Sequence, residues 1–545
     1  MRTRLPAVAL IAVAALGLTA CSSGAGEDSS TTLTILTPAS TVPLDPASSQ
    51  NLATTSLSLL DRRLTTWKVE EGKDAVVVPD LATTTGTQSD GGRTWTYTLK
   101  DGLKFSNGDP VTSEDVKYGI ERSFSDQLTG GLSYHKTLLE GGSDYRGPFD
   151  GKQLSSIETP DDRTIVFRLN KAFGDWPWIA SMPAFTPVLE SNGAPATYAK
   201  APITTGPYKV ESIKDGTALT LTRNTHWSAK TDSVRTASAD RVVFEEGQNQ
   251  TTVVQNLLTG SGKYADAFGA QYLGAADLSA ASRDAQGKQR LATSEAGPIQ
   301  YLALNTKRGE LKDVRVRQAL NHAVDRRSYL LASGGSAAGI AATTLITPGI
   351  AGRQAYDLYP AGTSGDVTKA QQLLRQAGVS GLKLTMLLQN DSASLAQGQA
   401  VQQGLQRIGV AVTLKPEDAE SFYVDAAADD KPFDLVLASW QPDFPSANAN
   451  ISPLFDSSQI GGGNYNLSQY DVPEVDRAIA AAQAETDQSA AQADWAAIDR
   501  RIMQDAPVVP LIYAKQSFLH GSGVGNFFIP SFPAYPDYMT LTVGK

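Results

Sequence analysis

The sequence predicts an α/β protein that folds into more than one lobe. Strand-like and helix-like patterns alternate from one end of the chain to the other. Apolar residues make up 41% and charged residues 19%, which is a normal balance for a globular core. At 545 residues the chain exceeds what one core usually supports, so two or three lobes are expected.

Four segments carry the strand prediction. Residues 33–36 form a short apolar run that stops before Pro38. Residues 94–100 alternate apolar or aromatic with polar side chains, which predicts a half-buried strand, and 164–169 follow a turn as another strand. Residues 433–440 are apolar on both faces after their first polar residue, so we expect a buried central strand there.

Helices are predicted from capping and stop signals. Thr112 and Asp115 have the spacing of a capping box, which predicts a helix start at that point. Apolar residues at helical spacing predict further helices at residues 314–323, 370–377 and 401–408. In the last two a glycine directly after the segment is expected to end the helix.

The N-terminus has the features of a bacterial lipoprotein signal. Arg2 and Arg4 precede an apolar run over 6–18, which is shorter than the roughly 20 residues that span a bilayer. Its end resembles a lipobox, so residues 1–20 are expected to be a signal peptide and Cys21 the lipidated residue. Residues 21–30, rich in glycine and serine, are expected to be a flexible tether at the extracytoplasmic face of the membrane.

Charge and cysteine content exclude several classes of function. The formal net charge is −10, and −12 without Arg2 and Arg4, which disfavours nucleic acid and anionic lipid as partners. Cys21 is the only cysteine, so no internal disulfide, cysteine zinc site or thiol nucleophile is possible. No cofactor or metal is expected.

Several segments resemble one known family. They lie at 91–116, 205–210, 304–326 and 440–444, in the order found in the large extracellular solute-binding proteins of peptide/nickel-type (family 5) ABC importers. The resemblance implies a type II periplasmic-binding-protein-like fold, of the large cluster C type: two lobes around a hinge, with an extra subdomain. It also implies a peptide-binding lipoprotein, expected to be monomeric, that delivers its ligand to an ABC permease and ATPase complex.

By the same resemblance the chain divides into three parts. Residues 31–60, 200–290 and 509–545 are expected to form lobe I, which holds both ends. Residues 61–199 are expected to form the extra subdomain and 291–508 lobe II.

Asp443 is the principal candidate for ligand binding. It lies in a proline-rich loop directly after the predicted buried strand, and in peptide-binding relatives the aspartate of this motif pairs with the ligand's α-amino group. Ser439, Trp440 and Gln441 accompany it, since the backbone there pairs with the ligand as an added strand. Some members have an arginine six residues before the aspartate, where this chain has Leu437, so recognition of the ligand's far end stays open.

Alternatives stay open for these residues and for the ligand. Asp443 can instead cap a turn beside its prolines, and Trp440 can be a core residue. Other members of the family bind oligosaccharides, haem, opines or nickel complexes, and a sensory role would use the same binding chemistry. A surface-anchored hydrolase is a weaker alternative, because the four histidines are far apart in sequence and no nucleophile motif is present.

Other conspicuous residues are expected to be structural. Arg315 and Arg317 lie on a predicted helix, where charges face solvent or form structural pairs. Residues 205–208 are interpreted as a shaped turn. Trp176 and Trp178 are interpreted as core of the extra subdomain.

Overall fold

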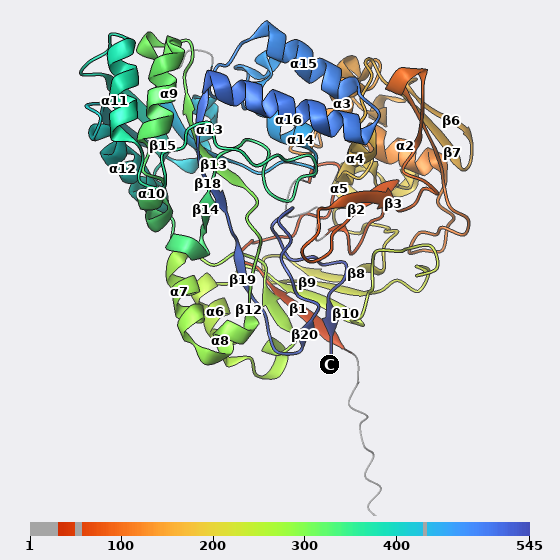
Figure 1. Ribbon diagram of the computed structural model, residues 1–545. Helices are drawn as coiled ribbons and strands as arrows, with labels where there is room; N and C mark the ends of the chain where they lie inside the picture. Colours follow the sequence, from red (N-terminus) through yellow and green to blue (C-terminus); the bar gives the residue numbers. More distant parts are fainter. Residues whose placement is uncertain (1–30, 50–56, 429–432, 545) are drawn as a thin grey trace, which may run out of the picture.

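The computed structural model describes residues 31–49, 57–428 and 433–544 (Figure 1). The predictions for residues 1–30, including the signal peptide, the tether and lipidation at Cys21, lie outside these ranges. Within the described residues, no helix has both the length and the apolar character that crossing a membrane requires.

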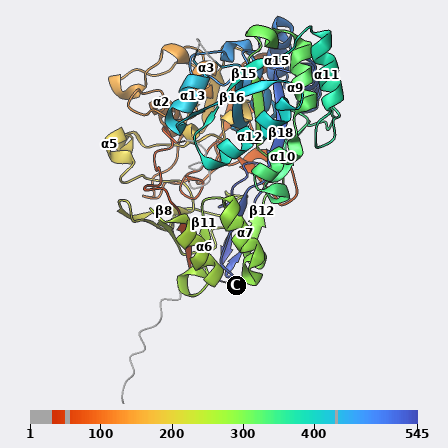
Figure 2. The same ribbon diagram turned by 90° about the vertical axis from the view of Figure 1, so that its left-hand side faces the viewer.

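The smaller of the two main sheets holds the strand nearest the N-terminus second from one edge. Its order is β11-β1-β10-β9-β8, with β1 parallel to both neighbours and the remaining pairs antiparallel. The strands are β1 (Thr32–Leu36), β8 (Tyr208–Lys214), β9 (Ala218–Arg223), β10 (Arg241–Glu245) and β11 (Ala267–Gly269). Helix α6 (Gln250–Thr259) packs against β11, and α7 (Ala275–Arg283) and α8 (Ala285–Arg290) pack against α6. Figure 2 shows α6 and α7 beside β11.

The larger sheet has six strands in the order β14-β18-β13-β17-β15-β16. They are β13 (Ile299–Leu304), β14 (Gly339–Ala341), β15 (Lys383–Gln389), β16 (Ala411–Glu417), β17 (Leu435–Trp440) and β18 (Val508–Ala514). The strand expected at 433–440 is therefore β17, and it is central, between β13 and β15. It is buried throughout except at Ser439.

Helices cover both faces of the six-stranded sheet. On one face Leu302 and Leu437 pack with the helices α9 (Val314–Ala323), α10 (Arg326–Ala332), α11 (Val367–Gln376) and α12 (Ser392–Gln406). On the other face Val436 and Trp440 share a core with α14 (Ala447–Phe455), α15 (Pro473–Ala484) and α16 (Gln488–Asp505). The short helix α13 (Ala419–Ala426) follows β16. Figure 1 shows the first set and α14–α16 as separate groups.

A third unit contains an antiparallel sheet in the order β4-β5-β7-β6 and the hairpin of β2 and β3. The strands are β2 (Thr65–Lys68), β3 (Val76–Pro79), β4 (Thr87–Ser89), β5 (Thr94–Thr98), β6 (Ile157–Asp161) and β7 (Thr164–Arg168). Its helices are α2 (Ser113–Arg122), α3 (Tyr134–Leu138), α4 (Trp176–Ile179) and α5 (Pro195–Tyr198). The expected capping box is present at α2: Thr112 accepts from the Asp115 N–H, and Asp115 accepts from the Thr112 N–H.

Two antiparallel strands connect the main sheets. The chain passes from the smaller to the larger sheet through β12 (Leu291–Thr293) and returns through β19 (Ser517–Leu519), which pairs with β12. A further pair, β20 (Val524–Gly525) and β21 (Thr542–Val543), lies near the C-terminus. β18 pairs with β13, so the chain leaves the larger sheet after Ala514, whereas the boundary between lobes was expected between residues 508 and 509.

The residues expected to be structural have structural roles. Trp176 and Trp178 are buried in the core. Arg315 pairs with Asp313, and Arg317 donates to the Asp505 carbonyl at 2.6 Å. The turn at 205–208 is tightly packed: a Cβ on Gly206 would come within 2.7 Å of the Leu60 backbone, so a side chain cannot be accommodated there.

Candidate functional site

Asp443 follows the end of β17 by three residues and receives a hydrogen bond from the third unit. The Tyr134 hydroxyl donates to Asp443 Oδ2 at 2.7 Å. No backbone N–H of its own loop is bound by this carboxylate among the contacts of the described residues, so the turn-capping alternative is not what the structure shows. The neighbouring helix start is capped by Ser446 instead, which accepts from the Asn448 N–H.

The electrostatic setting of Asp443 is that of a carboxylate without a counter-charge. The side chain is half-buried, and this burial raises the pKa of Asp443, while the hydrogen bond from Tyr134 offsets part of the rise. No charged side chain in the described part of the chain contributes to the shift. Burying a carboxylate without a cation is costly, so the site favours a ligand that supplies one.

Aromatic rings lie close to this carboxylate. Tyr134 packs edge-on against Phe444 with ring centroids 5.5 Å apart. Trp440 contacts Tyr465 at 5.0 Å, and the Tyr465 side chain remains 42% exposed. The electron-rich face of an accessible tyrosine adds to the attraction for an organic cation.

Trp440 is mainly a core residue. Only 9% of it is exposed, and its indole N–H donates to the Ala449 carbonyl at 2.8 Å, across the loop that carries Asp443. This bond fixes the loop against α14. Trp440 therefore positions Asp443 and presents Tyr465, and forms little of any cleft surface itself.

Ser439 and Gln441 differ from Trp440 in their exposure and in the parts of the chain that their side chains contact. Ser439 is the exposed position of β17, opposite Gln300 of β13, and the hydroxyl of Tyr423 is hydrogen-bonded to it. Gln441 donates to the carbonyl of Pro533, in the segment that follows β20. These two residues thus contact different parts of the chain from one loop.

The third unit and the larger sheet meet at a second polar contact. Ser446 donates to Asp175 Oδ2 at 2.7 Å, and burial raises the pKa of Asp175. Together with the Tyr134 contact, this hydrogen bond joins the third unit to the loop after β17.

Leu437 of β17, six residues before Asp443, lies within the core. It is 7% exposed and lies opposite Leu302 of β13.

Tyr134, Tyr465 and Tyr423 were not identified from the sequence. Tyr134 is 309 positions from Asp443 and belongs to no recognisable motif. Tyr465 and Tyr423 lie in a loop and a short helix without a distinctive spacing. Only the fold brings these hydroxyl groups and rings to the loop after β17.

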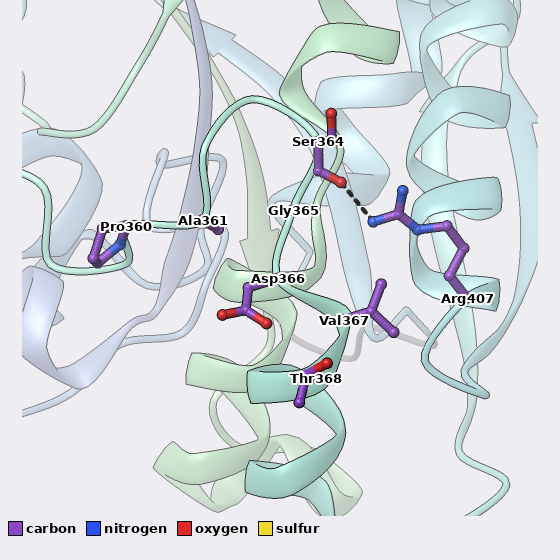
Figure 3. Close-up of a pocket in the computed structure, with 8 residues that line it drawn as sticks. All are labelled: Pro360, Ala361, Ser364, Gly365, Asp366, Val367, Thr368 and Arg407. Atoms are coloured by element: carbon purple, nitrogen blue, oxygen red, sulfur yellow. Dashed lines mark hydrogen bonds between the residues drawn. The ribbon is translucent and has the colours of Figure 1, made fainter.

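A separate recess of about 560 Å³ lies at the start of α11 (Figure 3). Its polar groups have partners, because Arg407 donates to the Ser364 carbonyl at 2.5 Å and Asp366 caps α11. It contains none of the candidate site residues. In the described residues no group of three or more His, Cys, Asp or Glu side chains has an arrangement that would hold a metal ion.

Two sheets joined by paired strands, with a carboxylate that lacks a counter-charge at the end of a central strand, define a two-lobed solute-binding protein. Residues 76–462 match the family model of bacterial extracellular solute-binding proteins, family 5 (middle region). The chain belongs to this family. The predicted α/β, two-lobed, periplasmic-binding-protein-like fold is therefore confirmed, and members of the family are binding proteins.

Relatives and solved structures support the same assignment. The chain is 26% identical, over 86% of its length and 85% of the relative's, to the "Probable D,D-dipeptide-binding periplasmic protein DdpA" of Escherichia coli K12. It is 26% identical to the periplasmic murein peptide-binding protein MppA of the same organism, with 81% of each chain covered. The solved clavulanic acid biosynthesis oligopeptide binding protein 2 has a TM-score of 0.88 and 31% identity, covering 94% of this chain and 95% of that one.

Proposed function

We propose that this protein is a lipid-anchored receptor that captures peptides outside the membrane and delivers them to an ABC permease and ATPase complex. The ligand lies between the lobes, and its amino end pairs with Asp443. The observation that carries the proposal is this half-buried carboxylate, which accepts a hydrogen bond from the Tyr134 hydroxyl and which no cation among the described residues neutralises. A peptide ammonium would supply the missing charge and a second hydrogen bond.

Three further features support a peptide. The exposed Ser439 lies at the end of β17, where an extended ligand can pair with the backbone. Tyr465 and Tyr423 leave ring surface next to this position. The relatives named above bind dipeptides, murein peptides and oligopeptides, as their names state.

Strand pairing supports a division of the chain into lobes. We assign 31–60, 200–290 and the residues after β18 to lobe I, 61–199 to the extra subdomain and 291–514 to lobe II. Ligand binding energy would then favour the closed arrangement, and a permease that recognises this arrangement would receive loaded protein.

In this proposal the protein binds its ligand and catalyses no reaction. His135 is fully buried, and this burial lowers its pKa to about 3, so it is neutral and structural. His322 and His520 also have pKa values lowered by burial. None of the histidines is hydrogen-bonded to a carboxylate in the described residues, as a catalytic triad would require.

Peptide binding is tested with ligands that differ only at the amino end. We expect a free-amine peptide to bind, and its N-acetylated form to lose at least ~2 kcal/mol, because Asp443 is then left buried and unpaired. Asp443→Asn should have the same effect, whereas Asp471→Asn, which removes an exposed carboxylate paired with Lys307, should have none. Isothermal titration measures all of these. Equal affinity of the free and acetylated peptides would refute the role of Asp443.

The lipid anchor is tested separately. Cys21→Ala should move the protein from the membrane fraction to the soluble fraction of cells and remove the acyl mass from the intact protein. Membrane association that persists in this variant would contradict the anchor and leave the peptide proposal intact.

A further inference from the structure

A cavity of about 690 Å³ lies beside β12, apart from the candidate site. Its walls come from the turn between β2 and β3, from β12, from β14 and from the segment after β20. None of the residues of the Asp443 site lines it. Its volume is in the range of small-molecule pockets, roughly 300–1,000 Å³. We call it the hinge cavity.

The position of the hinge cavity makes it sensitive to the arrangement of the lobes. Strands β12 and β19 are the connections between the main sheets, and β12 is one wall. Other walls belong to lobe II, through Ile340, and to lobe I, through Phe527. A rotation about β12 and β19 would move these walls relative to one another, so a molecule that fits here would favour one lobe arrangement.

In this structure lobe II contacts both lobe I and the extra subdomain on the side of the candidate site. Gln441 of lobe II donates to the Pro533 carbonyl of lobe I, and Tyr134 of the extra subdomain donates to Asp443. A molecule that stabilises the present shape of the hinge cavity would therefore also stabilise the contacts around Asp443.

The lining combines an apolar floor with acidic edges. Ile340 is 45% exposed although it is a large apolar residue, and the largely buried Phe528 and Ile529 complete the apolar part of the lining. Glu71, Asp74 and Glu295 line the same cavity.

The positive groups of the lining do not balance these acids. Lys73 is paired with Glu70, which lies outside the lining. Burial lowers the pKa of His520, so this ring is neutral at pH 7. None of the three acidic residues forms an ion pair with a described residue, and the cavity is thus complementary to a compact apolar body that carries one positive charge.

We propose that the hinge cavity is a second binding site, for a small amphiphilic amine, and that its occupancy favours the lobe arrangement seen here. The alkyl or aromatic body lies against Ile340 and Phe528, and the ammonium faces Glu295. The second half of the proposal rests on the proposed function, since it adds that the amine and a peptide at Asp443 strengthen each other's binding.

The direct test is titration of octylammonium into the Asp443→Ala variant, which removes the other carboxylate that attracts amines. We expect saturable 1:1 binding, weakened at least tenfold by Glu295→Gln combined with Ile340→Ser. Val424→Ser, which changes an apolar side chain that is 67% exposed outside the cavity, should leave it unchanged. Octanoate and 1-octanol should bind at least tenfold more weakly than octylammonium.

The outcomes separate this site from the proposed function. No saturable binding, or binding that the cavity variants leave unchanged, overturns the hinge site whatever Asp443 does. Binding that is lost in Asp443→Ala and kept in the cavity variants places the amine at Asp443 and also overturns it. If binding is as expected, octylammonium should bind the unaltered protein saturated with peptide, in which Asp443 is occupied, severalfold more tightly than it binds the Asp443→Ala variant without peptide. Equal affinities in these two measurements overturn the coupling alone.

Discussion

The Tyr134 hydroxyl lies 2.7 Å from Asp443 Oδ2, and this bond joins the extra subdomain to the loop that ends the central strand of lobe II. Tyr134 begins α3, and the next residue, His135, anchors that helix in the core. The His135 ring packs edge-on between Phe124 and Phe185, with centroids 5.2 and 5.7 Å away. Asp443 is thus positioned by Tyr134, and the helix that carries Tyr134 is itself anchored in the core of the extra subdomain.

Removing the Tyr134 hydroxyl should raise the pKa of Asp443 further. Tyr134→Phe keeps the ring against Phe444 and removes the donor that stabilises the ionised form. Since an amine ligand pairs with the ionised form, we expect the acid limit of peptide binding to move to higher pH. Affinity measured as a function of pH checks this. Tyr465→Phe, which leaves the Tyr134 bond in place, is the control, and an unshifted profile for Tyr134→Phe would contradict the assignment.

Local patterns predicted the elements of this fold well, because capping and alternation depend on neighbours in sequence. The capping box of α2 and the buried strand β17 are where the sequence places them. The pairing of β18 with β13 in the larger sheet could not be predicted, because strand pairing is a long-range choice that apolar runs alone do not encode. Asp443 was identified through its motif, whereas Tyr134 was missed because only tertiary structure brings it there.

Asp61 is a buried carboxylate whose two oxygens have no hydrogen-bond partner within the described residues. Burial is the main cause that raises its pKa to about 7; Arg63 and Arg235 lower it, Asp45 raises it, and Arg122 lowers it. Since the folded-state pKa lies above the unfolded value, the contribution of Asp61 to the free energy of unfolding should fall as pH rises from about 4 to 7 and then level off.

Asp61→Asn should remove the loss of unfolding free energy that ionisation of Asp61 causes. We expect the variant and the unaltered protein to have similar unfolding free energies near pH 4.5, and the variant to be more stable by a few kcal/mol at pH 8. Asp80→Asn is the matched control, because Asp80 binds Arg62 and Arg235 at 2.7 and 3.0 Å and its loss should destabilise by about 3–5 kcal/mol. Urea unfolding at both pH values measures this. If Asp61→Asn and the unaltered protein are equally stable at pH 8, ionisation of Asp61 does not destabilise the folded protein, and the prediction is wrong.

His135 should make the fold sensitive to acid. Its Nε2 lies 2.7 Å from Ser123 Oγ, its Nδ1 is buried and has no hydrogen-bond partner among the described residues, and burial lowers its pKa to about 3. At this position the unfolded chain binds a proton near pH 6.5 and the folded chain does not, so the contribution of His135 to the free energy of unfolding should fall as pH drops from 6.5 towards 3, opposite in sign to that of Asp61. His135→Leu should flatten this part of the profile. Denaturant unfolding from pH 7 to 4 tests it, and an unchanged slope would assign the acid sensitivity to other groups.

Leu437 limits how this chain can recognise the far end of a ligand. It lies six residues before Asp443, on the face of β17 that packs with Leu302 and Leu435 in the core of lobe II. Leu437→Arg would therefore bury a guanidinium without a partner, and we expect it to cost at least ~3 kcal/mol of unfolding free energy.

Such a variant should gain no affinity for a peptide with a free carboxylate over its amide, because Leu437 is only 7% exposed and the introduced charge would be enclosed by the core. Leu437→Met, which conserves volume, should cost less than about 1.5 kcal/mol and serves as the control. Chemical unfolding combined with titration of a matched peptide acid and amide measures both effects. A stable Leu437→Arg protein with a new preference for the acid would show that this position faces the ligand, and that the strand register around Ser439 differs from the one described.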